Sequence, residues 1–160
     1  MTAGTLLSAI LLAAAFSDIL TRRIPNWMTG LLALAFVPVA VFLDLSLVEF
    51  GWHLAAGFIA LVAGFGLHAL RWVGGGDVKL FAGAALWLGW PDLLPLFVLT
   101  SVAGGILAVF FLFFQRLRSS PQFLILQPWI GSGALKKGMP YGVAIAVAGI
   151  WISQTSLTLI

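Results

Sequence analysis

The sequence predicts an all-α, polytopic membrane protein with about six transmembrane helices. Of its 160 residues, 62% are hydrophobic and only 8% are charged, whereas a soluble domain usually carries about 25% charged residues. So few charges could not cover a surface that faces water, but a surface that faces lipid needs none. The seven Trp residues agree with this class, because their amphipathic rings favour the headgroup level of a bilayer.

Stretches without charged residues give the expected helices in order. The first precedes Asp18, and the others cover residues 24–43, 50–70, 93–115 and 138–160. Each of these five holds 17 to 23 residues, close to the roughly 20 that cross a hydrocarbon core of about 30 Å. Residues 80–91 give only 12 positions. A short fourth span is therefore expected from Asp77 to Leu94, with the Lys79 side chain reaching the membrane interface.

Two further segments bear on the number of spans. Residues 119–135 are also uncharged, but Pro, Gly and Gln interrupt them, so a loop on the interface is expected there. A secretory signal has basic residues before its apolar core, but the apolar start of this chain has none. A first helix that is retained in the protein is therefore expected. No internal repeat is found, so residues 1–160 are expected to form a single membrane-embedded domain.

The placement of charges predicts the topology. With six spans, one side of the membrane receives all eight basic residues, which are Arg22, Arg23, Arg71, Lys79, Arg116, Arg118, Lys136 and Lys137. The opposite loops hold Asp44, Glu49 and Asp92, with no Lys or Arg. Cytoplasmic loops are enriched in basic residues. Both termini are therefore expected outside, and the location is expected to be the cytoplasmic (inner) membrane.

The composition also excludes several kinds of chemistry. The chain contains no Cys, which removes disulfides, thiolate nucleophiles and cysteine metal sites. The net charge of +3 comes from scattered residues, so no nucleic-acid partner is expected. His53 and His68 are expected near opposite ends of one span, with His68 packed or hydrogen-bonded in the core. Neither a metal site nor a cofactor is expected.

Asp18 and Asp77 are the two carboxylates predicted on the cytoplasmic side, each at the end of an apolar helix. Asp18 could be a loop charge paired with Arg22, four residues further on. Asp77 could be a helix N-cap, a position that favours Asp. Three consecutive glycines precede Asp77, and they allow another backbone to approach closely. These are Gly74, Gly75 and Gly76.

A pair of aspartates at one depth of the membrane offers a specific chemistry. Two neighbouring carboxyl groups cannot both ionise freely, so they share a proton. The ionised member can take a proton from water while the protonated member hydrogen-bonds a peptide carbonyl. The residues alone leave two other functions open, a small membrane transporter or channel and a non-catalytic subunit.

Three segments resemble the motifs of prepilin peptidases, the type IV prepilin leader peptidases of the GxGD aspartic protease family. Phe16-Ser17-Asp18-Ile19 and Arg22-Arg23-Ile24-Pro25-Asn26 resemble the first catalytic motif. Gly74-Gly75-Gly76-Asp77 matches GxGD, and Pro140-Tyr141-Gly142 is similar to the segment that opens the last helix of the family. The three segments occur in the family's order across nearly the whole chain.

The resemblance implies an aspartic endopeptidase that removes the leader of type IV pilin-like precursors at the cytoplasmic face. Asp18 and Asp77 would be the catalytic pair, and the glycines would admit a membrane-inserted substrate as an extended strand. Larger members carry an extra region with paired cysteines that is associated with N-methylation. The chain resembles the compact members of tight-adherence (Flp) pilus systems, and N-methyltransferase activity is not expected. A non-catalytic pilus-assembly subunit that keeps the fold is the alternative within this resemblance.

Three other residues receive smaller roles. Lys79 could orient the leader or simply follow the enrichment of basic residues in cytoplasmic loops. Tyr141 could line the site or anchor its helix at the interface. Asn26 is expected to be the N-cap of the second span.

Overall fold

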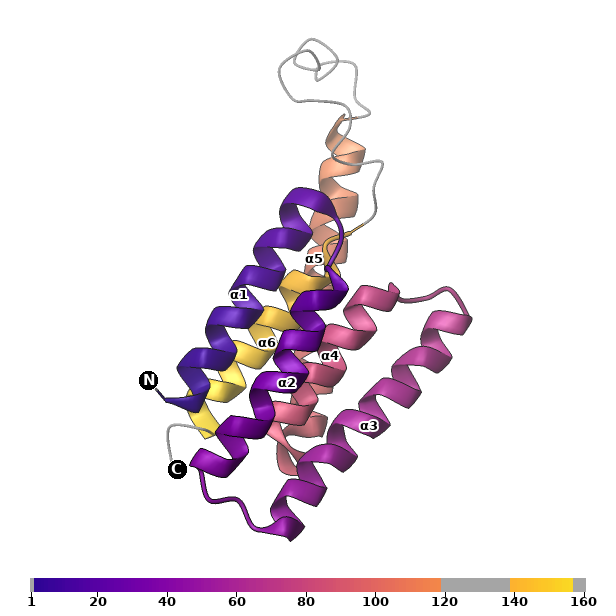
Figure 1. The fold of residues 1–160 in the computed structure, drawn as a ribbon. Coiled ribbons are helices and arrows are strands. Elements are labelled where there is room, and N and C mark those ends of the chain that lie inside the picture. The colour runs from indigo at the N-terminus through magenta and orange to yellow at the C-terminus, as the bar shows by residue number, and fades with distance from the viewer. Residues whose placement is uncertain (1, 119–138, 157–160) are drawn as a thin grey trace.

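The computed structural model describes residues 2–118 and 139–156, and these residues form six α-helices (Figure 1). The all-α prediction is therefore confirmed. The helices are α1 (Ala3–Thr21), α2 (Asn26–Phe42), α3 (Leu47–Ala69), α4 (Gly75–Leu88), α5 (Trp90–Arg118) and α6 (Tyr141–Ser156).

Helix α4 is the centre of the bundle, since it contacts each of the other five helices. Eight of its 14 residues are buried, and four consecutive small residues at 82–85 let neighbouring helices approach. Within the described residues, α4 is also the one helix without an exposed large hydrophobic side chain. At about 1.5 Å per residue it is only about 21 Å long. The protein itself, rather than lipid, surrounds this short helix.

The outer helices expose apolar side chains in the way a membrane protein does. Three of them, α1, α3 and the part of α5 from Trp90 to Phe114, are long and apolar enough to cross a membrane, and α2 is a shorter apolar helix of 17 residues. Leu12, Leu34, Phe58 and Val109 are all more than half exposed. Contiguous exposed apolar surface is uncommon on soluble monomers. The described helices thus contain three candidate spans, whereas the expected number was six.

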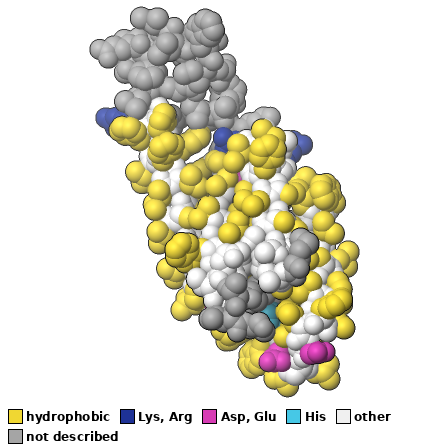
Figure 2. All heavy atoms as spheres, turned by 90° about the vertical axis from the view of Figure 1, so that its left-hand side faces the viewer, with side chains coloured by type: hydrophobic (Ala, Val, Ile, Leu, Met, Phe, Trp, Pro, Cys, Tyr) yellow, Lys and Arg dark blue, Asp and Glu magenta, His cyan; other side chains and the backbone are white. Residues whose placement is uncertain are grey.

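The charged side chains separate along the bundle. Connections α1–α2 and α3–α4 lie at the same end of the bundle as the start of α6, while the start of α1 and the α2–α3 connection lie at the other (Figure 1). Figure 2 shows Lys and Arg side chains gathered at one end and Asp and Glu mainly at the opposite end, with hydrophobic side chains between them. This separation agrees with the alternation of loops predicted from the sequence.

One predicted boundary was wrong. The expected helix from Asp77 to Leu94 is two helices, because α4 ends at Leu88 and α5 begins at Trp90. Gly89 lies between them with φ 80°, a conformation that L side chains avoid and that glycine adopts freely. The His53 ring also occupies the place of a Cβ at Gly89, which would come within 2.9 Å of it.

Several smaller predictions also need correction. Asn26 is not an N-cap: Pro25 occupies that position, and Asn26 is the first residue of α2. Glu49 and Asp92, expected in loops, lie in the first turns of α3 and α5. His68 is exposed rather than packed in the core, although it hydrogen-bonds the carbonyl oxygen of Val73. The expected loop at 119–135, with Lys136 and Lys137, lies outside the described residues.

Candidate active site

Asp18 lies in the last turn of α1, on the side that faces the bundle. Arg22 ends the helix in the left-handed conformation at φ 55° and donates its backbone N–H to the Asp18 carbonyl at 2.9 Å. Although Ile19 and Leu20 beside it are more than half exposed, Asp18 is only 6% exposed. A carboxyl group buried this far needs hydrogen-bond partners inside the protein.

Helix α6 supplies such a partner. The first backbone N–H groups of a helix have no partner within it and favour negative charge. Gly142, the second residue of α6, donates its N–H to Oδ2 of Asp18 at 2.9 Å. A Cβ on Gly142 would lie 2.8 Å from the same oxygen and 3.0 Å from Cδ1 of Ile24. Only glycine leaves room for the carboxyl group here.

Asp77 lies in the first turn of α4, whose N-cap is Gly74. Its carboxyl group accepts a hydrogen bond from the backbone N–H of Gly74, as the acidic residue of a capping box does. A Cβ on Gly74 would come within 2.7 Å of Oδ2 of Asp77. Asp77 thus helps to cap the N-terminus of α4, as considered from the sequence, but it lies three residues after the N-cap position rather than at it.

The other two glycines are packed against the protein. A Cβ on Gly76 would lie 3.3 Å from Cβ of Ile24, and one on Gly75 would lie 3.4 Å from the His68 ring. Ile24, 9% exposed, therefore joins the α1–α2 connection to the start of α4 and, through Gly142, to α6. Gly76 and Gly142 thus let the ends of α1, α4 and α6 approach one another, while Gly75 lets the start of α4 approach α3.

The structure brings Asp18 and Asp77 close enough to interact electrostatically. The positive charge of Arg22 also interacts electrostatically with the carboxyl group of Asp18, and the carboxyl group of Asp77 interacts electrostatically with Tyr141. Lys79 points elsewhere: its Nζ donates to Oδ1 of Asn26 in α2 at 2.9 Å. Two carboxyl groups that interact electrostatically can hold one proton between them.

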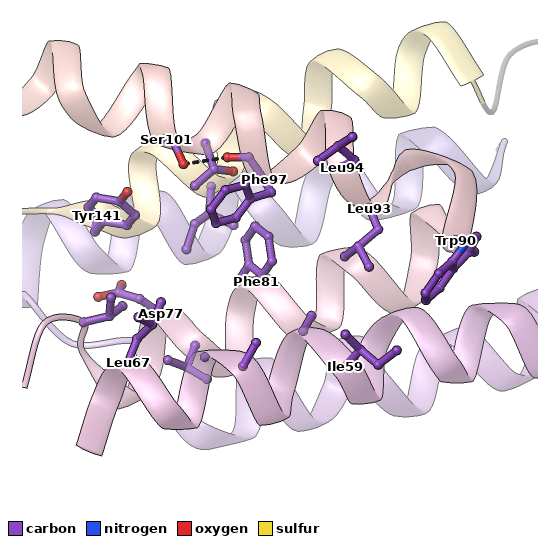
Figure 3. A pocket seen from close by; sticks show the side chains of 17 residues that line it. Ile59, Leu67, Asp77, Phe81, Trp90, Leu93, Leu94, Phe97, Ser101 and Tyr141 are labelled. Carbon is purple, nitrogen blue, oxygen red and sulfur yellow. Dashed lines mark hydrogen bonds between the residues drawn. The ribbon is translucent and has the colours of Figure 1, made fainter. Parts of the chain in front are cut away.

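A largely apolar cleft of about 420 Å³ begins at Asp77 and runs between α3 and α5 over α4. Asp77 and Tyr141 lie at one end and Trp90 at the other (Figure 3). The Tyr141 ring packs over Gly104 of α5, where a Cβ would lie 2.6 Å from it. Tyr141 therefore lines the cleft. The remaining lining residues are Ile59, Ala60, Ala63, Gly64, Leu67, Val73, Val78, Phe81, Leu93, Leu94, Phe97, Thr100, Ser101 and Ile145.

Sequence reasoning missed two contributors to this site. Gly142 was part of a motif in the sequence, but its role as a hydrogen-bond donor to Asp18 was not predicted. A glycine in the first turn of a helix could have indicated such a backbone donor. Thr100 is buried at 4% exposure and lines the cleft. A single Thr in a long apolar run gave no signal. No group of three or more His, Cys, Asp or Glu within the described residues could hold a metal ion.

The fold and the site define a helical membrane protein with two interacting carboxyl groups at one end of its bundle and an apolar cleft leading away from them. The chain belongs to the type IV leader peptidase family, a family of aspartic peptidases, whose model matches residues 5–109. The matched residues include Asp18 and Asp77.

Comparison with curated proteins gives a relative in the same family. The chain is 34% identical over 162 aligned positions to the "Prepilin leader peptidase/N-methyltransferase" of Dickeya chrysanthemi. The alignment covers 89% of this chain, which spans about half, 50%, of that relative's length. No solved structure matches the chain significantly.

Proposed function

We propose that the chain is an aspartic endopeptidase that removes the leader peptide of type IV pilin-like precursors, with Asp18 and Asp77 as its catalytic pair. The proposal is supported by the electrostatic influence of Asp18 on Asp77 in a chain of the leader peptidase family. Each carboxyl group is also positioned by a backbone N–H from the start of a helix. Neither carboxyl group therefore depends on a long, mobile side chain to hold it in position.

The pair would hydrolyse a peptide bond with one shared proton. The ionised carboxylate takes a proton from water, and the water oxygen attacks the scissile carbonyl carbon while the protonated carboxyl group hydrogen-bonds the carbonyl oxygen. The resulting tetrahedral intermediate breaks its C–N bond. The carboxyl group that took a proton from water gives that proton to the departing amine. The pair then holds one proton again.

We further propose that six helices span the cytoplasmic membrane as a single domain, with both termini outside and the carboxyl pair on the cytoplasmic side. The support is the separation of basic and acidic side chains to opposite ends of the bundle (Figure 2), together with the enrichment of Lys and Arg in cytoplasmic loops. A basic leader on the cytoplasmic side of a precursor would then reach the pair without crossing the bilayer.

The expected substrate is a membrane-inserted pilin-like precursor, and the expected subtype is the compact peptidase of tight-adherence (Flp) pilus systems. Gly74, Gly75 and Gly76 stay candidates for contact with the substrate backbone. Their structural support is their place at the start of α4 beside Asp77, where Gly74 is exposed. Lys79 and Tyr141 are weaker candidates, Tyr141 through the cleft that it shares with Asp77.

The test is coexpression of the chain with a pilin precursor from a neighbouring gene, with leader removal scored by mobility and mass. Asp18→Asn and Asp77→Asn keep side-chain size but cannot exchange a proton, so each should abolish processing. Asp92→Asn, the same change at the other end of the bundle, should process like the parent. Full processing by either the Asp18 or the Asp77 variant would refute the pair.

A second measurement separates an enzyme from an assembly subunit. The purified chain in detergent should cleave a synthetic precursor without any other protein, and the two Asn variants should not. If cleavage requires a further component of the pilus system, the chemistry belongs to that component and not to this chain.

A further inference from the structure

His68 lies in the last turn of α3, beside the connection that leads to α4 (Figure 1). Its Nδ1 lies 2.9 Å from the carbonyl oxygen of Val73, further along the chain. Because a carbonyl oxygen can only accept a hydrogen bond, Nδ1 must carry the proton that is donated. The bond is therefore present in the neutral ring with its proton on Nδ1 and also in the doubly protonated ring.

The carbonyl group that His68 binds belongs to the peptide bond between Val73 and Gly74. A peptide bond is planar and trans, so the direction of the Val73 carbonyl fixes the direction of the Gly74 N–H. That N–H donates to the carboxyl group of Asp77. One rigid peptide group thus accepts a hydrogen bond from His68 and donates one to Asp77. Hydrogen bonds in such a chain polarise and strengthen one another.

The peptide between Val73 and Gly74 needs an anchor of this kind. Gly74 is exposed, and glycine turns more freely about its backbone bonds than other residues do. A stiffer residue cannot take its place without moving the carboxyl group, since a Cβ on Gly74 would lie 2.7 Å from Oδ2 of Asp77. The backbone at Gly74 must therefore be held by another residue, and His68 holds it from α3.

The His68 ring is itself held by contacts on both helices. It packs against Gly75, where a Cβ would lie 3.4 Å from Cε1 and from Nε2 of the ring. The Phe65 ring on α3 meets it edge-on, with the ring centroids 6.3 Å apart. These contacts orient Nδ1 toward the Val73 carbonyl.

Building on the proposed function, we propose that His68 is a positioning residue for the catalytic pair. It orients the Val73–Gly74 peptide so that the N–H of Gly74 holds the carboxyl group of Asp77 where it can share a proton with Asp18. Its Nδ1 bonds the backbone rather than a carboxyl group, so it acts on the geometry of the pair. The role depends on a donor at the place of Nδ1 and not on the charge of the ring.

The first test separates the donor from the ring. His68→Phe keeps a planar ring against Gly75 but removes the donor, so kcat for the precursor should fall about 5- to 50-fold while KM changes less than about twofold. His68→Asn places an amide N–H near the position of Nδ1 and should restore kcat to at least about half of the parent value. A parent-like kcat in His68→Phe, a loss carried by KM, or equal losses of kcat in the two variants would each overturn the proposal.

The matched control is the same kind of bond at the other end of α3. Nδ1 of His53 lies 2.8 Å from the carbonyl oxygen of Leu86, near the end of α4. His53 is half-buried, so His53→Phe should lower the unfolding temperature and leave kcat within about twofold of the parent value. His68→Phe should show the reverse, a lower kcat with a nearly unchanged unfolding temperature. Similar losses of kcat in both variants would reveal a general effect of packing between α3 and α4 and overturn the specific role of His68.

The second test measures the peptide itself and needs no cleavage. With isotope-labelled glycine followed by NMR, the amide proton of Gly74 should exchange with solvent at least about tenfold faster in His68→Phe than in the parent or in His68→Asn. The reason is that an exposed amide without its hydrogen bond is no longer protected. Equal exchange in His68→Phe and the parent would overturn the proposal. If the parent chain does not cleave the precursor, the proposed function fails, and the exchange rates still show whether His68 holds this peptide.

Discussion

Gly142 offers a direct way to move Asp18 without changing either carboxyl group. Replacing it by Ala keeps the backbone N–H that donates to Asp18 at 2.9 Å. The new Cβ would lie 2.8 Å from Oδ2, about 0.6 Å inside the 3.4 Å at which ordinary contact begins. Cδ1 of Ile24, at 3.0 Å on another side, blocks an easy escape of the methyl group. The Asp18 carboxyl group must therefore move.

The size of the effect follows from that displacement. A misplacement of about 1 Å in a catalytic constellation can reduce the rate about 100-fold, so a shift of this size should lower kcat by about 10- to 100-fold. Overpacking usually costs about 1–3 kcal/mol of folding free energy, and the helix preference of Ala over Gly offsets about 0.5–1 kcal/mol of it. Most of the variant should remain folded while its activity is largely lost.

The assay is the initial rate of leader removal by purified protein in detergent, with the unfolding temperature measured on the same samples. Gly105→Ala is the control, because a Cβ there meets nothing within 4 Å and should leave both quantities near the parent values. Cleavage by Gly142→Ala at the parent rate would refute the reasoning. It would mean that the position of the Asp18 carboxyl group does not govern catalysis.

Three further substitutions test other parts of the structure. Gly74→Ala places a Cβ 2.7 Å from Oδ2 of Asp77 and should lower the cleavage rate at least tenfold by the same displacement argument; a parent-like rate would contradict it. Gly89→Ala puts a side chain at φ 80° and ψ −174°, a conformation that is essentially limited to glycine, and should destabilise the fold by about 1–3 kcal/mol, seen as a lower unfolding temperature. Trp87→Phe removes the indole donor to the Leu32 carbonyl at 2.7 Å; it should cost about 1–3 kcal/mol, and an unchanged unfolding temperature would count against that hydrogen bond.

The sequence predicted most helices because charge and apolar length are local properties. The stretches before Asp18 and at residues 24–43 and 50–70 correspond to α1, α2 and α3, with ends shifted by a few residues. The break at Gly89 was missed because apolar residues continue on both sides of it. It depends on a single backbone angle and on the His53 ring, which approaches from a different helix.

The candidate site was predictable in part for a similar reason. Asp18 and Asp77 could be selected because loop alternation places both at one end of the bundle. The central place of α4 could not be deduced from its 14 residues, since it depends on which helices pack around it. The backbone donor to Asp18 comes from α6, and the ring that covers Gly104 of α5 comes from Tyr141. Such contacts between distant segments have no local pattern in a single sequence.

The hydrogen bond between Gly142 and Asp18 has a consequence for how the protein is made. It joins residues that are 124 positions apart, in the first and last of the described helices. A ribosome releases α1 into the membrane long before it has synthesised α6. Until then, the carboxyl group of Asp18 lacks its backbone donor, and the cleft lacks Tyr141. In a nascent chain the surroundings of the proposed catalytic residue Asp18 would thus stay incomplete until the last of these helices docks.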